Sequence, residues 1–118
     1  MAMLYGLARC DTCRKARAWL EQHGIAHVFI DYREQPVPAG TLREWARQLG
    51  WERLVNRSST TWRALDEAVK SPQSEADWLR LVTAHPTLVR RPVLVLDGGA
   101  VHVGFRPDRY AQLFAGAR

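Results

Sequence analysis

The chain has 118 residues, of which 47% are hydrophobic and 25% charged, and its formal net charge is +5 at pH 7. This length and balance are typical of one globular domain with its own core, and they exclude a disordered chain. No apolar run is long enough to cross a membrane, and no signal-like segment precedes the first predicted strand. We therefore expect a cytoplasmic protein that does not bind membranes.

The 17 basic residues are almost all arginine, Lys15 and Lys70 being the two lysines, and they are scattered along the chain. A protein that binds nucleic acid usually gathers its basic residues into a patch, so we expect no nucleic-acid partner. The forked guanidinium group suits carboxylates and oxyanions. The charge therefore favours a small anionic substrate, and a monomer is the default expectation.

The N-terminal part of the chain predicts a strand–helix–strand unit. Residues 2–7 have the length and apolar character of a strand, residues 12–23 have helical spacing up to Gly24, and residues 26–32 predict a second strand. This order forms a βαβ unit with a right-handed crossover. Residues 33–40 contain two prolines and are predicted to be a connection.

The middle of the chain predicts several helices. We expect a helix capped by Thr41 and ended by Gly50, a loop over residues 51–59, a short helix opened by Thr60 or Thr61 that runs to Ala68, and a further helix after Ser74. Ser74 followed by Asp77 resembles a capping arrangement.

The C-terminal part returns to strands. Residues 92–96 and 100–103 predict two strands joined by the turn Asp97-Gly98-Gly99, and Pro107 opens a last helix. The whole order is that of an α/β, thioredoxin-like fold with a small mixed β-sheet. We therefore predict a single domain over residues 1–118, with an inserted helical section at about residues 38–86.

The two cysteines, Cys10 and Cys13, stand where the first strand ends and the first helix begins. Helix-start amides lack partners within the helix, and the helix dipole adds positive charge there. Arg9, Arg14 and Lys15 add formal charge, and such surroundings lower a cysteine pKa from about 8.5. Cys10 is therefore predicted to be a nucleophilic thiolate, with Cys13, one helical turn later, able to resolve its adducts.

Two other interpretations of the cysteines are weaker. They are either small buried residues without chemistry, or half of a zinc site. A zinc site needs two further ligands, and the histidines of the chain form no recognisable knuckle; they are His23, His27, His85 and His102. The spacing, the helix start and the basic neighbours together favour the redox interpretation.

Arg91-Pro92 directly precedes the third predicted strand. In thioredoxin-like folds an X-Pro bond at this place is commonly cis and lies beside the active cysteine, so we expect a cis bond before Pro92. The alternative is a trans proline at the start of a strand.

The chain resembles the arsenate-reductase (ArsC/Spx) family, and within it the small YffB-type proteins. The resemblance rests on motifs that span nearly the whole chain: Tyr5-Gly6, the segment from Cys10 to Leu20, Asp31-Tyr32-Arg33, Leu49-Gly50-Trp51, Asn56, the segment from Thr60 to Arg63, His85-Pro86, the segment from Arg90 to Val95, and the segment from Gly104 to Pro107.

The resemblance implies a nucleophilic cysteine at Cys10 and three arginines that hold an anion. Arg91, before the proline, and Arg106, in Phe-Arg-Pro, match two of them. The third falls on Asn56 or Arg57, depending on where a gap is placed, and we assign it to Arg57. A solvated surface charge is the alternative for each arginine.

The resemblance further implies a glutathione-dependent thiol–disulfide oxidoreductase or arsenate reductase. Glutathione is then a co-substrate and glutaredoxin a partner, with no metal or organic cofactor bound. Cys13 departs from many YffB-type chains and matches the Cys-x-x-Cys of Spx-type regulators. The alternative is therefore a redox-sensing transcriptional regulator that binds the RNA polymerase alpha subunit.

Overall fold

The computed structural model describes residues 1–115 and divides the chain into two compact units. Unit 1 comprises Met1–Gln35 and the chain from Arg91 onward, and unit 2 comprises Pro36–Arg90. Unit 2 begins and ends within a few residues of the predicted helical section at about 38–86. Both cysteines belong to unit 1.

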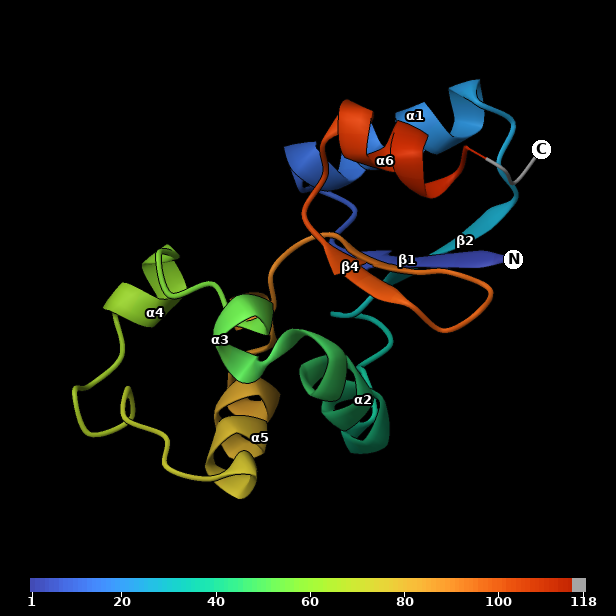
Figure 1. Ribbon diagram of the computed structural model, residues 1–118. Helices are drawn as coiled ribbons and strands as arrows, with labels where there is room; N and C mark the ends of the chain where they lie inside the picture. The colour runs from blue at the N-terminus through green and yellow to red at the C-terminus, as the bar shows by residue number, and fades with distance from the viewer. Residues whose placement is uncertain (116–118) are drawn as a thin grey trace. The chain divides into compact units, whose positions relative to one another are not determined.

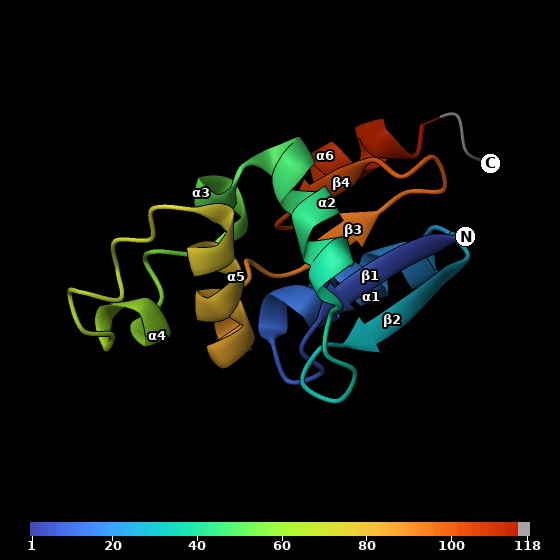
Figure 2. The same cartoon turned by 90° about the horizontal axis from the view of Figure 1, so that it is seen from below.

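Unit 1 is built on a mixed sheet of four strands in the order β2-β1-β3-β4. The strands are β1 (Ala2–Gly6), β2 (His27–Asp31), β3 (Val93–Val95) and β4 (Val101–Val103). β2 runs parallel to β1, whereas β1 with β3 and β3 with β4 are antiparallel (Figure 2). Because β1 and β2 are parallel and Gly6 is paired with Asp31, their carboxyl ends meet at one edge of the sheet.

Two helices, α1 (Asp11–Gln22) and α6 (Pro107–Leu113), lie on the same face of this sheet (Figure 1). Their apolar side chains pack on Leu4 of β1 and Leu94 of β3, both fully buried. The cluster comprises Ala2, Leu4, Ala16, Trp19, Leu20, Leu94, Tyr110 and Phe114. Alternate strand residues and one helix face thus form the core that fixes the start of α1 over the sheet.

Unit 2 contains α2 (Ala39–Leu49), α3 (Trp51–Leu54), α4 (Thr60–Arg63), α5 (Glu75–Ala84) and the 3₁₀ turn η1 (Pro86–Leu88). A β-bridge between Val55 and Val89 joins the segments that follow α3 and η1. Three tryptophans stack within this unit, Trp51 on Trp78 and Trp62 on Trp78, with ring centroids 6.0 and 6.4 Å apart. They serve the inter-helix packing that is usual for such residues.

Several boundaries in unit 2 differ from the prediction. α2 begins at Ala39 rather than after Thr41, with Pro38 at the N-cap, because proline needs no backbone donor there. Residues 51–54, predicted to be loop, form the short helix α3. α4 ends at Arg63 rather than near Ala68, and its N-cap is Ser59, whose hydroxyl accepts the Trp62 amide.

Other local predictions are confirmed. Ser74 caps α5, since its hydroxyl accepts a hydrogen bond from the Asp77 amide at 3.2 Å. Gly24 follows α1 with a φ of +63°, which favours glycine at that position. Pro107 occupies the first turn of α6. Within residues 1–115, no helix combines the length and apolar character that crossing a membrane requires.

Candidate functional site

Cys10 is the N-cap residue of α1, with extended backbone angles of φ −80° and ψ 126°. The loop before it is closed by a hydrogen bond from the Cys10 amide to the Leu7 carbonyl at 3.1 Å. A cap position places the side chain near the first amides of the helix, which have no intrahelical partners. Cys10 is partly exposed and forms no disulfide. Its sulfur is therefore both accessible and close to partial positive charge.

The pKa of Cys10 lies below its ordinary value. Burial alone would raise this pKa, but four groups outweigh it: the Cys13 amide, the Cys13 thiol, the Arg91 guanidinium and the Thr12 amide. The amides of Thr12 and Cys13 favour the thiolate by hydrogen bonding, and they belong to the first turn of the helix, where the dipole is positive. The arrangement therefore favours the nucleophilic form of this cysteine.

The basic residues of the early helix contribute less than the sequence suggested. Arg14 donates hydrogen bonds to the carbonyls of Ala8 and Arg9 and pairs with Asp11 at 3.7 Å. Its charge is thus used to hold the loop that carries Cys10. The cation that acts on the sulfur is Arg91, which is distant in sequence.

Cys13 is fully buried in the first turn of α1. Burial, with the neighbouring Cys10, raises the pKa of Cys13 to about 11. Cys13 therefore remains a neutral thiol while Cys10 is ionised, and its S–H group stabilises the Cys10 thiolate. The pKa values of two cysteines one helical turn apart are thus shifted in opposite directions, and the two thiols have different roles.

Arg91 lies two residues before β3, and the Arg91–Pro92 peptide bond is cis. Its Nη1 donates a hydrogen bond to the hydroxyl of Tyr32 at 3.3 Å. The same guanidinium also acts on the sulfur of Cys10. Arg91 is thus the predicted anion-binding arginine that the structure brings to the nucleophile.

A cavity of about 470 Å³ opens at Cys10. It is lined by three arginines, two acidic residues, the cysteine and two apolar residues: Arg9, Arg33, Arg91, Asp31, Glu34, Cys10, Leu7 and Ala8. Asp31 ties the cavity wall together, because its carboxylate accepts the Ala8 amide at 3.0 Å and the Arg33 amide at 2.9 Å. These bonds, the Ala8 bond above all, lower the pKa of Asp31.

The other two predicted arginines are not among the residues that line the Cys10 cavity. Arg106 is the exposed N-cap residue of α6, and its guanidinium pairs with Asp108 at 2.9 Å rather than lining the Cys10 cavity. Arg57 lies on an exposed turn of unit 2, where the Asn56 side chain accepts the Ser58 amide at 3.0 Å. The roles assigned to Arg57 and Arg106 stay predictions.

Three residues of the site were given no role from the sequence: Gly6, Asp31 and Tyr32. Each lies at or just beyond the carboxyl end of β1 or β2. A signal was available, because parallel strands of a βαβ unit end at the same edge, where the loop carrying Cys10 also begins. Asp31 and Tyr32, at the end of the second strand, could therefore have been predicted to lie near Cys10.

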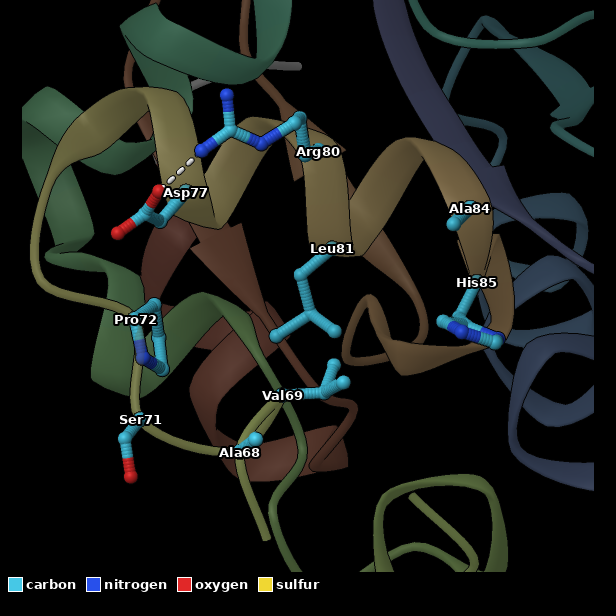
Figure 3. A pocket seen from close by; sticks show the side chains of 9 residues that line it. All are labelled: Ala68, Val69, Ser71, Pro72, Asp77, Arg80, Leu81, Ala84 and His85. Carbon is cyan, nitrogen blue, oxygen red and sulfur yellow. Dashed lines mark hydrogen bonds and ion pairs between the residues drawn. The ribbon is translucent and has the colours of Figure 1, made fainter. Parts of the chain in front are cut away.

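A second cavity, of about 420 Å³, lies wholly within unit 2 (Figure 3). It is lined by Ala68, Val69, Ser71, Pro72, Asp77, Arg80, Leu81, Ala84 and His85. Asp77 and Arg80 are paired to one another across its rim. No cysteine is among these lining residues, so a thiol reaction would take place at the Cys10 cavity of unit 1. Among the described residues, no three His, Cys, Asp or Glu side chains gather as a metal ion would require.

Solved structures with this architecture confirm the fold prediction. A protein named YffB is 44% identical, with 95% of this chain and 97% of that chain covered and a TM-score of 0.88. An arsenate reductase (ArsC) related protein from Brucella melitensis is 43% identical, with 96% and 93% covered and a TM-score of 0.75.

Two curated relatives align over almost the whole chain. An uncharacterized protein of Haemophilus influenzae is 41% identical over 115 residues, which are 98% of this chain and 100% of the relative. The global transcriptional regulator Spx of Bacillus subtilis is 33% identical over 110 residues, 92% of this chain and 82% of the regulator. The ArsC family model matches residues 5–113. With the cysteine-bearing helix start and the arginine before β3 inside that match, the chain belongs to the ArsC family.

Proposed function

We propose that this protein is a glutathione-dependent thiol–disulfide oxidoreductase that uses the Cys10 thiolate as its nucleophile. Membership of the ArsC family and the likeness to an arsenate reductase related protein support a thiol oxidoreductase. The observation that carries the proposal is that the pKa values of the two cysteines are shifted in opposite directions. The pKa of the accessible Cys10 is lowered, while the pKa of the buried Cys13 beside it is raised to about 11.

The charges that line the Cys10 cavity support glutathione as the co-substrate. Glutathione carries two carboxylates and one ammonium group. The cavity offers the guanidinium groups of Arg9, Arg33 and Arg91 for the carboxylates, and Glu34 for the ammonium. Arginine binds carboxylates through two parallel hydrogen bonds, which also fixes their orientation. A site for a small oxyanion alone would have no use for the acidic residue.

The reaction follows from the state of the two sulfurs. The Cys10 thiolate attacks the glutathione sulfur of a mixed disulfide, so that a Cys10–glutathione disulfide forms and the substrate leaves as a thiolate. A second glutathione thiolate then attacks the glutathione sulfur of this adduct. Oxidised glutathione leaves and the Cys10 thiolate is regenerated. No external base is required, because the nucleophile is ionised before the attack.

Cys13 offers a second way to resolve the adduct. Its thiol must first lose a proton, after which it attacks the Cys10 sulfur and releases glutathione as a thiolate. The raised pKa of Cys13 opposes this step while Cys10 is an anion, because that anion contributes to the shift. Adduct formation removes the negative charge and thus the part of the shift that Cys10 causes. With arsenate, Cys10 would instead attack arsenic and expel water, before glutathione and glutaredoxin complete the reduction.

The proposal is tested by intact mass spectrometry after incubation with oxidised glutathione. Wild type, Cys10→Ser and Cys13→Ser form a matched set, since each variant keeps one sulfur. A glutathionyl adduct that is retained in Cys13→Ser and absent in Cys10→Ser supports the proposal. An internal disulfide in wild type, seen as a loss of two hydrogens, assigns resolution to Cys13. An adduct that needs Cys13 but not Cys10 contradicts the assignment of the nucleophile.

A redox-sensing regulator is the second candidate function, because Cys13 lies against Cys10 and a regulator named Spx is a 33% identical relative. This function requires binding to the alpha subunit of RNA polymerase rather than turnover. A pull-down with the C-terminal domain of that subunit, using reduced and oxidised protein, separates the two candidates. Specific binding that depends on the oxidation state supports the regulator, and its absence leaves the oxidoreductase.

A further inference from the structure

We propose that Tyr32 is a positioning residue, whose hydroxyl group holds the Arg91 guanidinium in place against the sulfur of Cys10. The inference rests on the proposed function only in taking Cys10 as the reactive group. It concerns how Arg91 is held, and it holds for any substrate that the thiolate attacks.

Tyr32 is placed by the sheet itself. It directly follows β2, and its amide donates a hydrogen bond to the carbonyl of Gly6 at 3.0 Å, which extends the β1–β2 pairing by one residue. Its side chain is only 2% exposed. The ring therefore has one environment, and the hydroxyl reaches Arg91 Nη1 at 3.3 Å.

The hydrogen bond to Tyr32 restricts the conformations that the Arg91 side chain can adopt. An arginine side chain has many rotamers, and holding one of them costs conformational entropy. The guanidinium lines the cavity with Cys10, and both Tyr32 and Cys10 interact with it. The hydrogen bond from Nη1 to the Tyr32 hydroxyl favours the rotamers that keep the guanidinium beside the sulfur.

The chemistry of a tyrosine fits this role better than that of an acid. Burial raises the pKa of Tyr32, despite the opposing effect of Arg91, and the nearby Cys10 and Cys13 raise it further. The hydroxyl therefore keeps its proton over the pH range in which Cys10 changes from a thiol to a thiolate. It accepts a hydrogen bond from Arg91 without adding a second negative charge that would compete with the thiolate for this cation.

The chain contains a matched control in Tyr110. This tyrosine of α6 is also buried, at 1% exposure, and lies among the rings of Trp19, Phe105 and Phe114. Its hydroxyl has no hydrogen-bond partner among the described residues. Tyr110→Phe therefore removes a buried hydroxyl of unit 1 that does not hold Arg91.

The test measures the rate at which iodoacetamide alkylates Cys10 as a function of pH, with mass spectrometry to separate Cys10 from Cys13 adducts. In Tyr32→Phe we expect the profile to move to higher pH by about half a unit, so that the rate below the transition falls about threefold. Tyr110→Phe should leave the profile where it is in wild type. Thermal unfolding followed by circular dichroism verifies that both variants are folded.

A double-mutant cycle identifies Arg91 as the intermediary. In the Arg91→Met background, Tyr32→Phe should cause no further shift of the alkylation profile. An unchanged profile in Tyr32→Phe, or the same shift with and without Arg91, overturns the inference. Iodoacetamide is neutral and needs no glutathione. If glutathione fails to react while Tyr32→Phe still moves the profile, then the proposed function is wrong and the role of Tyr32 stands.

Discussion

Gly6 and Cys13 lie so close together that residue 6 has no room for a side chain. A Cβ atom added to Gly6 would stand 2.4 Å from the Cys13 sulfur and 3.4 Å from its Cβ. Real carbon atoms are not found at the first of these distances from a sulfur. Gly6, the last residue of β1, is thus part of the site, because only a residue without a side chain leaves space for the buried Cys13.

Gly6→Ala is therefore expected to destabilise the protein by about 1–3 kcal/mol, the usual cost of overpacking a buried site. Cys13 is fully buried, so its sulfur has little space into which to rotate. The free energy of unfolding, measured by urea denaturation, tests this. Gly40→Ala is the matched control, because among the described residues no atom outside the adjoining backbone of α2 lies within 4 Å of a Cβ at this helical glycine. We expect it to stabilise the protein by about 0.5–1 kcal/mol.

A rescue experiment shows whether the sulfur is the obstacle. In a Cys13→Ala background the contact at 2.4 Å is absent and the contact at 3.4 Å is ordinary. The loss of unfolding free energy caused by Gly6→Ala should then be less than half of the loss in the wild-type background. A cost that is unchanged in this background would mean that the strand itself, and not Cys13, rejects the alanine.

Arg91 and Arg106 are expected to act on different steps. Arg91 acts on Cys10 directly, whereas Arg106 pairs with Asp108 away from the cavity. Arg91→Gln should therefore raise the pKa of Cys10 and slow its alkylation by neutral iodoacetamide about 3–10-fold at pH 7, since one pKa unit is tenfold. Arg106→Gln should leave that rate unchanged and, if Arg106 binds substrate as the family resemblance implies, raise KM for an anionic disulfide. Equal effects of both variants on alkylation would contradict this division.

Alkaline pH should destabilise the protein through Cys13. Its pKa rises on folding from 9.0 to about 11, so the folded state retains a proton that the unfolded state has released. Stability is then complete below pH 9 and decreases towards pH 11, by an amount on the order of 2 kcal/mol. Urea denaturation at pH 8 and pH 10.5 measures the change for wild type and Cys13→Ala.

The variant removes the titrating thiol, so its stability should fall less over this range. Equal losses in both proteins would assign the alkaline effect to other groups, such as tyrosines and lysines.

The sequence predicted the parts of this site that depend on local pattern. The strand, the turn with Cys10 and the helix with Cys13 follow one another in the chain, so apolar spacing and helix-start chemistry were sufficient to place them. The hairpin turn at Asp97 and the start of α6 at Pro107 also depend on a few adjacent residues. The N-cap at Ser74 belongs to the same class.

The parts that depend on pairing between distant segments were not accessible in this way. Which cation acts on Cys10 depends on β3 lying beside β1. Nearness in sequence pointed to Arg9, Arg14 and Lys15, whereas Arg91 was assigned only through the family resemblance. The role of Tyr32 depends on the register of β2 against β1. The helix α3 was missed because a four-residue helix has too few residues for a periodic pattern.

Asp31 is expected to act as a tether for the loop that carries Cys10. Its carboxylate is the shared acceptor for the Ala8 amide, two residues before Cys10, and the Arg33 amide in the cavity wall. An asparagine keeps the shape but replaces one acceptor oxygen with a donor, so one of these bonds is lost. We expect Asp31→Asn to lower the free energy of unfolding at pH 7 by about 1 kcal/mol, the typical net value of one such bond. The alkylation of Cys10 should also slow, because the loop is held less firmly.

The pH dependence distinguishes this tether from a general effect of charge. The pKa of Asp31 is lowered on folding from 3.8, so its contribution is complete above that pH and is lost as the pH falls through the folded value. The difference between wild type and Asp31→Asn should therefore shrink below pH 3.8. Asp66→Asn, an exposed site in unit 2, makes the same charge change and should have little effect at either pH. A difference at Asp31 that persists unchanged in acid would show that its carboxylate is not the group that holds the loop.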